Sequence, residues 1–400
     1  MEVNLSADAM ATNLPFPPQY GSELLVIARG HGVWLEDVRG KRYLDFAGGI
    51  AVNALGYGRA DLAKTALRQM RKLNHISNLF TTEPSLALAR AMLERGPFPF
   101  RSVFFGNSGT EANEAALKYA RLHAFRTKGP GHANILCFSG AFHGRTFGSL
   151  SCTPSPKYQD PYMPLLPGVV VAPYNDARAL EGLLTSDFAG VIVEVIQGEG
   201  GLDGMTPEFA RALNDACRTR NAVLIADEVQ TGLGRTGALY ASETVGLQPD
   251  LITLSKPLGG GLPLSAVLIS EKVHEVIHQG DHGTTFGGGP VTTAVAGQVW
   301  RTITRPEFLV HVQEMGQVLG DGLELLHGRH PNTVGSVRGR GLLRGFEYTG
   351  GEVKDFLDRL RKAGMLALRS GANVMRIAPP LVIARKEIEK GIEILEEALQ

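Results

Sequence analysis

Two charged side chains follow short apolar runs near the middle of the chain. Asp227 comes after the run 222–226 (AVLIA), and Lys256 comes two residues after the run 251–254 (LITL). Both runs are aliphatic or β-branched, too short for a helix and not alternating with polar residues, which is typical of strands buried on both faces of a parallel sheet. The carboxyl ends of such strands open onto the ligand crevice of an α/β sheet. We therefore expect the acid and the amine to converge on one small molecule.

The neighbours of this pair favour a chemical role, although a charge after a strand is more often a solvated loop residue. Gln230 lies three residues after Asp227, and the glycine run 259–261 lets the backbone approach whatever Lys256 holds. An amine nucleophile with a carboxylate is what pyridoxal phosphate chemistry requires. The lysine forms a Schiff base with the cofactor, and the aspartate keeps the pyridine nitrogen protonated.

A second candidate site is the segment SVFFGNSGTEANEAALKYAR, which has the pattern of a strand, a tight glycine turn and a helix. Ser108 and Glu111 have the spacing of a capping box at the start of that helix. The backbone of Gly109 and Thr110, with the Thr110 hydroxyl, would then face the crevice and hold a phosphate. On this segment alone, an ordinary capped helix explains the pattern equally well.

Three further segments carry candidate ligand-binding side chains. The loop SGAFHGRTFGS contains Phe142, which could stack on a pyridine ring, and Arg145, which could bind a carboxylate with two hydrogen bonds. Alone, each is more often a packing residue or a surface charge. VEVIQGEGG contributes Glu199 and VMRIAPP contributes Arg376, which on the residues alone indicate at most a salt bridge.

The segments DEVQTGLGRTG and LSKPLGGGLP resemble those of class III, fold-type I aminotransferases, and most closely the acetylornithine-type members. The resemblance extends from about Tyr20 to the end of the chain. It implies an α/β fold with a large domain, in which helices flank a mostly parallel seven-stranded sheet, and a small α+β domain formed from both termini.

The resemblance also implies a role for each candidate residue. Lys256 and Asp227 are the expected catalytic pair, pyridoxal 5′-phosphate is the expected cofactor, and no metal is expected. The residues expected to bind the cofactor are Gly109, Thr110, Phe142, Asp227, Gln230, Lys256 and Thr285. The residues expected to bind substrate are Tyr20, Arg145, Glu199, Thr284 and Arg376.

One of these roles has a physical basis, and another is implied by the resemblance alone. A buried arginine without a partner is costly, so Arg376 needs the Glu199 carboxylate until the carboxylate of 2-oxoglutarate replaces it. The loop HGTTFGGGP, with Thr284 and Thr285, is implied to cross the interface of a homodimer with shared active sites. In this loop Gly289 stands where the family is expected to have asparagine, and residues 57–59 replace a more usual His-rich turn.

The implied reaction transfers the ω-amino group of N2-acetylornithine to 2-oxoglutarate, giving N-acetylglutamate 5-semialdehyde and glutamate in arginine biosynthesis. Ornithine, succinyldiaminopimelate, 4-aminobutyrate and lysine-pathway aminoadipate-semialdehyde transaminases are alternatives that differ in the group distal to the amine. A nucleotide-binding oxidoreductase is disfavoured because GNSGTEAN is not a GxGxxG turn. A non-catalytic protein of the same fold is disfavoured because Lys256 and Asp227 are both present.

Composition excludes several other classes. The 400 residues are 44% hydrophobic, enough for two domains, and 40 basic residues balance 40 acidic ones. A net charge of zero gives no electrostatic reason to bind nucleic acid or an anionic membrane, and the short RGRGLLRG piece does not alter this. Three cysteines without short spacing predict neither a disulfide framework nor a zinc site. Residues 1–19 lack lysine and arginine, so we expect no targeting segment and a cytoplasmic protein.

The elements that must position these residues follow from the apolar pattern. Residues 23–46 predict a small antiparallel meander, and 101–269 alternate short strands with helices. The C-terminal part combines longer amphipathic helices with two strand-like pieces, SVRGRGLLRGFEY and NVMRIAPP. The expected division is an N-terminal arm and part of the small domain at 1–60, a large cofactor-binding domain at 61–299, and a C-terminal small domain at 300–400.

Overall fold

A computed structural model of the chain describes residues 16–20 and 24–400. Its largest sheet has seven strands in the order β4-β10-β9-β8-β7-β5-β6, and each corresponds to an apolar run predicted from the sequence. The strands are β4 Phe100–Gly106, β5 Asn134–Phe138, β6 Val169–Ala172, β7 Phe188–Val193, β8 Val223–Asp227, β9 Leu251–Leu254 and β10 Ser265–Ser270.

β10 is the one strand of this sheet that runs against its neighbours, since it pairs antiparallel with both β9 and β4. The connection 255–264 contains no helix, so the chain reverses direction directly after β9. Lys256 lies at the start of that reversal. Its side chain therefore leaves the sheet at the carboxyl edge of β9, beside Asp227 at the end of β8, as the sequence predicted.

Helix α5 (Gly109–Lys128) packs against this sheet through small side chains. Ala112, Ala115, Ala116 and Tyr119 are buried along its inner face, as expected. The approach is close, because a Cβ added to Gly190 of β7 would lie 3.0 Å from the Cβ of Ala120. Glycine at that position lets the helix sit directly on the strand.

The predicted capping box at the start of α5 forms only in part. Ser108 Oγ accepts a hydrogen bond from Glu111 N at 3.4 Å, as expected for an N-cap. Glu111, however, does not reach back to Ser108. Its carboxylate accepts from the backbone and side-chain nitrogens of Asn107, at 2.9 and 2.7 Å, because Asn107 offers two donors one residue earlier.

Helix α9 (Pro207–Thr219) begins as predicted. Thr206 Oγ1 accepts from Phe209 N at 3.1 Å, Pro207 is the first helical residue, and Phe209 and Leu213 are buried. The other helices between residues 60 and 303 are α3 Ala60–Lys72, α4 Glu83–Glu94, α6 Phe147–Ser151, α7 Pro156–Gln159, α8 Ala177–Leu183, α10 Ser242–Val245, α11 Glu271–His274 and α12 Pro290–Ile303, with a 3-10 turn η2 Asp160–Tyr162.

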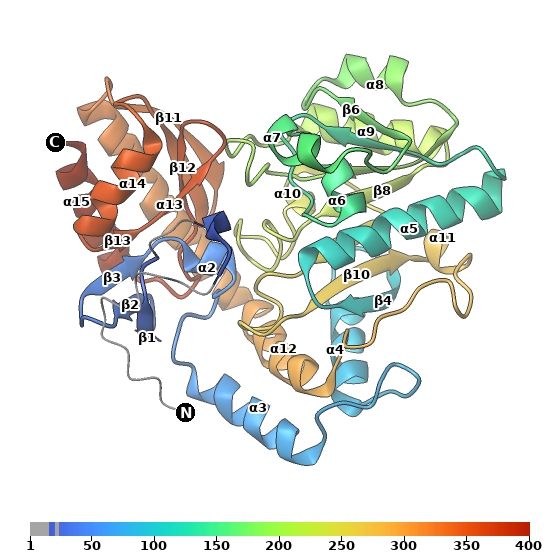
Figure 1. Cartoon of the computed structure of the whole chain (residues 1–400), viewed down its shortest axis with the longest axis horizontal. Coiled ribbons are helices and arrows are strands. Elements are labelled where there is room, and N and C mark those ends of the chain that lie inside the picture. Colours follow the sequence, from blue (N-terminus) through green and yellow to red (C-terminus); the bar gives the residue numbers. More distant parts are fainter. Residues whose placement is uncertain (1–15, 21–23) are drawn as a thin grey trace.

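Two four-stranded sheets form the other side of the molecule (Figure 1). The predicted meander is present as β1 Ile27–His31, β2 Trp34–Asp37 and β3 Arg42–Asp45, and β13 Met365–Leu366 extends it by pairing parallel to β3. The second sheet has the order β11-β12-β15-β14. Its strands are β11 Val334–Arg340, β12 Leu343–Tyr348, β14 Leu368–Ser370 and β15 Val374–Ile377.

Both ends of the chain thus contribute to one region, as expected for the small domain. Helices α13 Pro306–Arg329, α14 Val353–Lys362 and α15 Arg385–Leu399 lie beside β1–β3 in Figure 1, where the blue N-terminal strands meet the red C-terminal elements. The RGRGLLRG piece is the hairpin between β11 and β12. The domain boundaries at residues 60 and 300 stay predictions, and the expected arm of residues 1–19 lies mostly outside the described residues.

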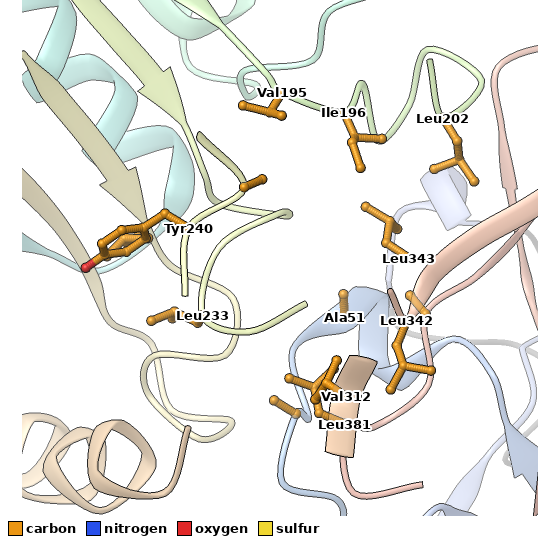
Figure 2. Packing of buried hydrophobic residues seen from close by; sticks show 14 of the residues in the cluster. Ala51, Val195, Ile196, Leu202, Leu233, Tyr240, Val312, Leu342, Leu343 and Leu381 are labelled. Atoms are coloured by element: carbon orange, nitrogen blue, oxygen red, sulfur yellow. The ribbon is translucent and has the colours of Figure 1, made fainter. Parts of the chain in front are cut away.

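One buried apolar cluster continues from the large sheet into the smaller ones. Figure 2 shows Leu233 and Tyr240 on one side, and Leu342, Val312 and Leu381 on the other. Removing this surface from water is the main term that stabilises the contact between the two regions. Within residues 16–20 and 24–400, no helix combines the length and apolar composition that crossing a membrane requires.

The packing of α15 on Phe46 predicts the effect of a small substitution. A Cβ added to Gly391 would lie 2.2 Å from the Phe46 ring, so Gly391→Ala should overpack this contact and destabilise the protein by about 1–3 kcal/mol. Gly328→Ala in α13 is the matched control, since nothing lies within 4 Å of the added atom. Its stability should change by about 1 kcal/mol at most. Urea denaturation measures both, and equal effects would contradict the contact.

Candidate active site

A cavity of about 910 Å³ opens where the carboxyl ends of β8 and β9 meet the loops that follow β4, β5 and β7. It is lined by most of the residues predicted from the sequence. They are Gly109, Thr110, Phe142, Arg145, Glu199, Asp227, Gln230 and Lys256. Its size is within the range of cofactor and small-molecule sites.

Asp227 is buried and held by donors from three directions. Its Oδ2 accepts from His143 Nδ1 at 2.7 Å and from Asn113 Nδ2 at 2.8 Å, and its Oδ1 accepts from Val229 N at 3.0 Å. These bonds fix the orientation of the carboxylate at the floor of the cavity. Burial lowers the pKa of His143, but the hydrogen bond and charge of Asp227 outweigh it, so the net shift of that pKa is upward.

The roles of His143 and Asn113 are ones that sequence analysis missed. His143 is adjacent to Phe142 and Asn113 is buried on α5, but their partner lies 84 and 114 residues away. A histidine beside a predicted cofactor contact was the available signal. His143 Nε2 is buried and has no hydrogen-bond partner among the described residues.

Lys256 lines the same cavity and donates from Nζ to Gln230 Oε1 at 2.6 Å. Burial lowers the pKa of Lys256 to about 8, and the positive charge of Arg376 acts in the same direction. A buried amine with a lowered pKa is the form in which a lysine acts as a nucleophile or base. Gln230 keeps a buried Nε2 donor without a partner in the described part of the chain.

Glu194 ties two walls of the cavity together. Its carboxylate accepts from Phe142 N at 2.9 Å and from Gly198 N at 3.1 Å, so one side chain fixes both the loop after β5 and the loop after β7. Burial raises the pKa of Glu194 to about 7, and the positive charge of His143 opposes that shift.

Glu199 and Arg376, which are 177 residues apart in sequence, form an ion pair. Arg376 NH1 donates to Glu199 Oε1 at 2.7 Å and to Gly198 O at 2.6 Å. The Arg376 side chain is only 3% exposed, whereas that of Glu199 is 37% exposed. The glutamate can therefore move away into the cavity, but the arginine is fixed.

Arg145 is held in a different way. Its guanidinium lies 3.7 Å from the ring centre of Tyr158 and 5.5 Å from that of Phe142, a stacked arrangement that leaves the hydrogen-bonding edge of the arginine free. No carboxylate of residues 16–20 or 24–400 pairs with it. Arg145 is exposed to the cavity.

The structure does not bring Thr284 and Thr285 into this cavity. Thr285 lines a separate small hollow with residues 75–78 and 287–290. Thr284 Oγ1 accepts from Gly287 N at 3.2 Å within its own loop. Tyr20 ends the 3-10 turn η1 Pro18–Tyr20, and its side chain lies outside the described residues.

The surface near that hollow is apolar. Leu67 and Met70 of α3 are 53% and 59% exposed, whereas Leu62 of the same helix is buried. Large apolar side chains in the loops 73–82 and 282–288 are also exposed. They are Leu79, Phe80 and Phe286, at 89%, 71% and 68%. We call these five side chains the α3 surface.

Comparison with known proteins decides the family. The sequence profile described as Aminotransferase class-III matches residues 16–399. The chain belongs to this family. A probable acetylornithine aminotransferase, mitochondrial, of Dictyostelium discoideum is 44% identical over 380 residues, which are 94% of this chain and 83% of that protein.

Two further similar proteins have related activities in their names. A succinylornithine transaminase of Yersinia pseudotuberculosis is 42% identical over 393 residues, covering 96% of this chain and 94% of that protein. The crystal structure of the ornithine aminotransferase from Toxoplasma gondii superimposes with a TM-score of 0.90 at 32% identity, covering 95% and 91% of the two chains. The chain is therefore an aminotransferase with the fold-type I architecture that the sequence predicted.

The residues at the cavity floor have the chemistry that pyridoxal phosphate needs. A carboxylate, an amine and an aromatic ring lie around one space, and the N-terminus of α5 opens onto it at Gly109 and Thr110. The buried Gln230 Nε2, which has no partner in the described ranges, supplies a further donor. The described residues contain no cluster of three or more candidate metal ligands.

The lowered pKa of Lys256 predicts how the stability of the cofactor-free protein varies with pH. The ordinary pKa is 10.5 and the folded value is about 8, so the unfolded state binds more protons between these values. Stability should rise with pH across that window, relative to a Lys256→Met variant that lacks the titration. Denaturation between pH 7 and about 10.5 measures the difference.

The same replacement at the exposed Lys64 controls for loss of a lysine charge. A difference between wild type and Lys256→Met that stays constant from pH 8 upward would show that the amine is not desolvated.

Proposed function

We propose that the protein transfers the ω-amino group of N2-acetylornithine, or of a close N2-acyl analogue, to 2-oxoglutarate. The observation that carries this proposal is the unequal state of two arginines, Arg145 in the cavity lining and Arg376 buried behind the cavity-lining Glu199. Arg376 is neutralised by Glu199, whereas Arg145 has a free hydrogen-bonding edge. This suits a donor whose reacting carbon bears no carboxylate and whose α-carboxylate lies remote from the amine, within reach of Arg145.

Pyridoxal phosphate, when bound, supplies the aldehyde that accepts the amino group and the ring that absorbs the electron pair released at the donor carbon. Lys256 Nζ removes the proton from that carbon, and its lowered pKa makes the neutral base available near neutral pH. Asp227 provides the anion for the ring nitrogen, with His143 and Asn113 holding it in place. The remaining cofactor contacts are those expected from the sequence: Gly109 and Thr110 at the phosphate, Phe142 on the ring, and Gln230.

The second half of the reaction uses the other arginine. 2-Oxoglutarate places a carboxylate next to its reacting carbon, and Arg376 is the cation available there once Glu199 moves aside. Arg376 is buried and costs free energy unless paired, so one carboxylate must replace the other. Glu199 thereby determines which substrate the site accepts in each half-reaction.

The succinylornithine transaminase among the relatives favours one alternative donor, N2-succinylornithine. It shares the reacting end and the α-carboxylate of N2-acetylornithine and differs only in the acyl group. A role in arginine biosynthesis rests on the names of the acetylornithine aminotransferase relatives. The cytoplasmic location remains a prediction from the sequence.

We further propose that the protein is a homodimer with shared active sites. The α3 surface consists of five exposed large apolar side chains, a kind of surface that protein–protein interfaces cover. Thr284 and Thr285 lie beside this surface and outside the cavity of their own chain. In a symmetric dimer formed through the α3 surface, this loop would reach the cavity of the partner subunit, with Thr285 at the cofactor phosphate and Thr284 at the substrate.

A donor panel with 2-oxoglutarate tests the reaction. The kcat/KM for glutamate formation should be highest with an N2-acylornithine, compared with ornithine, 4-aminobutyrate and succinyldiaminopimelate. Glu199→Gln should reduce the rate with the acylornithine and raise it with glutamate as donor, each by about tenfold, the order expected for one charged hydrogen-bonding partner. Glu275→Gln, an exposed glutamate remote from the cavity, is the control.

Single-turnover kinetics of each half-reaction, followed by cofactor absorbance, separates the two effects of Glu199→Gln. Equal slowing of both would show that the ion pair is only structural, and preference for an unacylated donor would refute the proposed substrate.

Sharing of active sites is tested by mixing two inactive chains. Lys256→Ala removes the amine, and Thr285→Val, if it inactivates its own homodimer, removes the donated hydroxyl. If Thr285 acts on the partner subunit, each mixed dimer has one intact site, and a random equal mixture should recover about a quarter of wild-type activity. Activity measured after mixing and re-equilibrating the chains gives the result. If Thr285 served its own site, every site would carry one lesion and no activity would return.

A further inference from the structure

Four successive residues beside the cavity adopt a left-handed conformation. Gly48, Gly49, Ile50 and Ala51 have φ values of 58°, 64°, 62° and 62°. They form the short helical turn α2 Gly48–Ala51, closed by a bond from Ala51 N to Ala47 O at 3.0 Å. For residues other than glycine this conformation is unfavourable, because the Cβ comes too close to the following carbonyl oxygen. The turn therefore persists only because its surroundings hold it.

The turn forms part of the cavity wall. Gly49 and Ile50 line the cavity, and the Ile50 side chain is 50% exposed. Ala51 points the other way into the apolar cluster, where Figure 2 draws it with Leu342 and Leu381. Gly48 lies against the segment after Arg376, since an added Cβ would meet Ala378 O at 2.4 Å.

Asp45, at the end of β3, is the group that holds the turn. It is 1% exposed, and its Oδ1 accepts from Ala47 N at 2.9 Å and from Gly48 N at 3.0 Å. Its Oδ2 accepts from the Tyr57 hydroxyl at 2.6 Å. That hydroxyl also accepts from Asn53 Nδ2 at 3.2 Å, so Tyr57 connects the start of the turn to the segment that follows it.

Tyr57 is itself fixed by the small sheet. Its backbone exchanges two hydrogen bonds with Gly32, of 3.1 and 2.8 Å, in the loop between β1 and β2. Burial, with the charge of Asp45, raises the pKa of Tyr57, so the hydroxyl stays protonated and donates to the carboxylate. Burial also raises the pKa of Asp45, although the hydrogen bond from Tyr57 opposes that shift. Tyr57 does not line the cavity.

We propose that Tyr57 is a positioning residue, whose hydroxyl holds Asp45 and thereby keeps the left-handed turn 48–51 in place as one wall of the donor-binding cavity. This inference rests on the proposed function. Tyr57 lies in the segment 57–59, where the sequence resemblance led us to expect a His-rich turn.

Tyr57→Phe tests the proposal by removing one hydroxyl. The KM for the N2-acylornithine donor should rise about tenfold, the order expected for a hydrogen bond to a charged group, while kcat changes less than about twofold because Lys256 and Asp227 lie outside the turn. Tyr43→Phe is the matched control. Tyr43 donates to Asp37 Oδ2 at 2.9 Å in the same small sheet but not at the cavity. Removing the Tyr43 hydroxyl should leave the donor KM unchanged. The proposal is overturned if the donor KM does not rise in Tyr57→Phe, or if it rises equally in both variants.

A second variant acts on the turn directly. Gly48→Ala adds an atom against Ala378 O at a left-handed position, so it should raise the donor KM at least as much as Tyr57→Phe. Gly40→Ala, with φ of 82° and nothing within 4 Å of the added atom, is its control and should leave KM unchanged. An unchanged KM in Gly48→Ala would also overturn the proposal.

Hydrogen–deuterium exchange separates this inference from the proposed substrate. In the holoenzyme the amides of residues 47–53 should exchange about tenfold faster in Tyr57→Phe than in wild type or Tyr43→Phe. Unchanged exchange refutes the role of Tyr57. Faster exchange in a protein that does not transaminate acylornithines refutes the proposed function and leaves the positioning role standing.

Discussion

The carboxylate of Asp227 imposes the strictest constraint on the architecture. A buried anion is stable only when its oxygens accept several hydrogen bonds, and here the donors come from α5, from the loop after β5 and from the backbone after β8. Those segments are far apart in sequence. The sheet order that places β5, β7, β8 and β9 together is what brings them to one point, and Glu194 then fixes the neighbouring loops to each other.

Much of the fold and part of the site were predictable because they depend on local pattern. The seven apolar runs of the large sheet are strands, and Asp227 and Lys256 lie at the ends of two of them. β13 and β14 went unseen because they have two and three residues, too few for any periodicity. Their existence depends on pairing with β3 and β15, which local sequence does not encode.

The parts that could not be predicted depend on long-range contacts. The sequence around His143 and Asn113 does not reveal their shared role, because both bond to Asp227, at the distant end of β8. Glu111 has capping-box spacing, but Asn107 offers it better donors. The link from Tyr57 to Asp45 spans twelve residues and a left-handed turn, and no propensity favours isoleucine in that conformation. Tyr20 was predicted from resemblance alone, and its side chain lies outside the described residues.

Arg145, which lines the cavity, and Arg376, which is buried behind Glu199, show how the surroundings of one kind of side chain determine its role. Arg376 is enclosed and ion-paired, so its charge becomes available only by exchange of one anion for another. Arg145 rests on the flat face of Tyr158, which supports the guanidinium without consuming its donors. A guanidinium that stacks on an aromatic ring can bind a substrate carboxylate directly, whereas a guanidinium that is ion-paired must first lose its carboxylate partner.

The parallel pairing of β3 with β13 has a consequence for how the molecule is made. Residues 44–45 leave the ribosome long before their partners, residues 365–366, which follow all seven strands of the large sheet in the chain. The large sheet between them can fold as the chain emerges, while β1–β3 complete their sheet only after residues 365–366 have emerged. The cavity wall that contains the left-handed turn, which directly follows β3, is therefore completed after the large sheet has been synthesised.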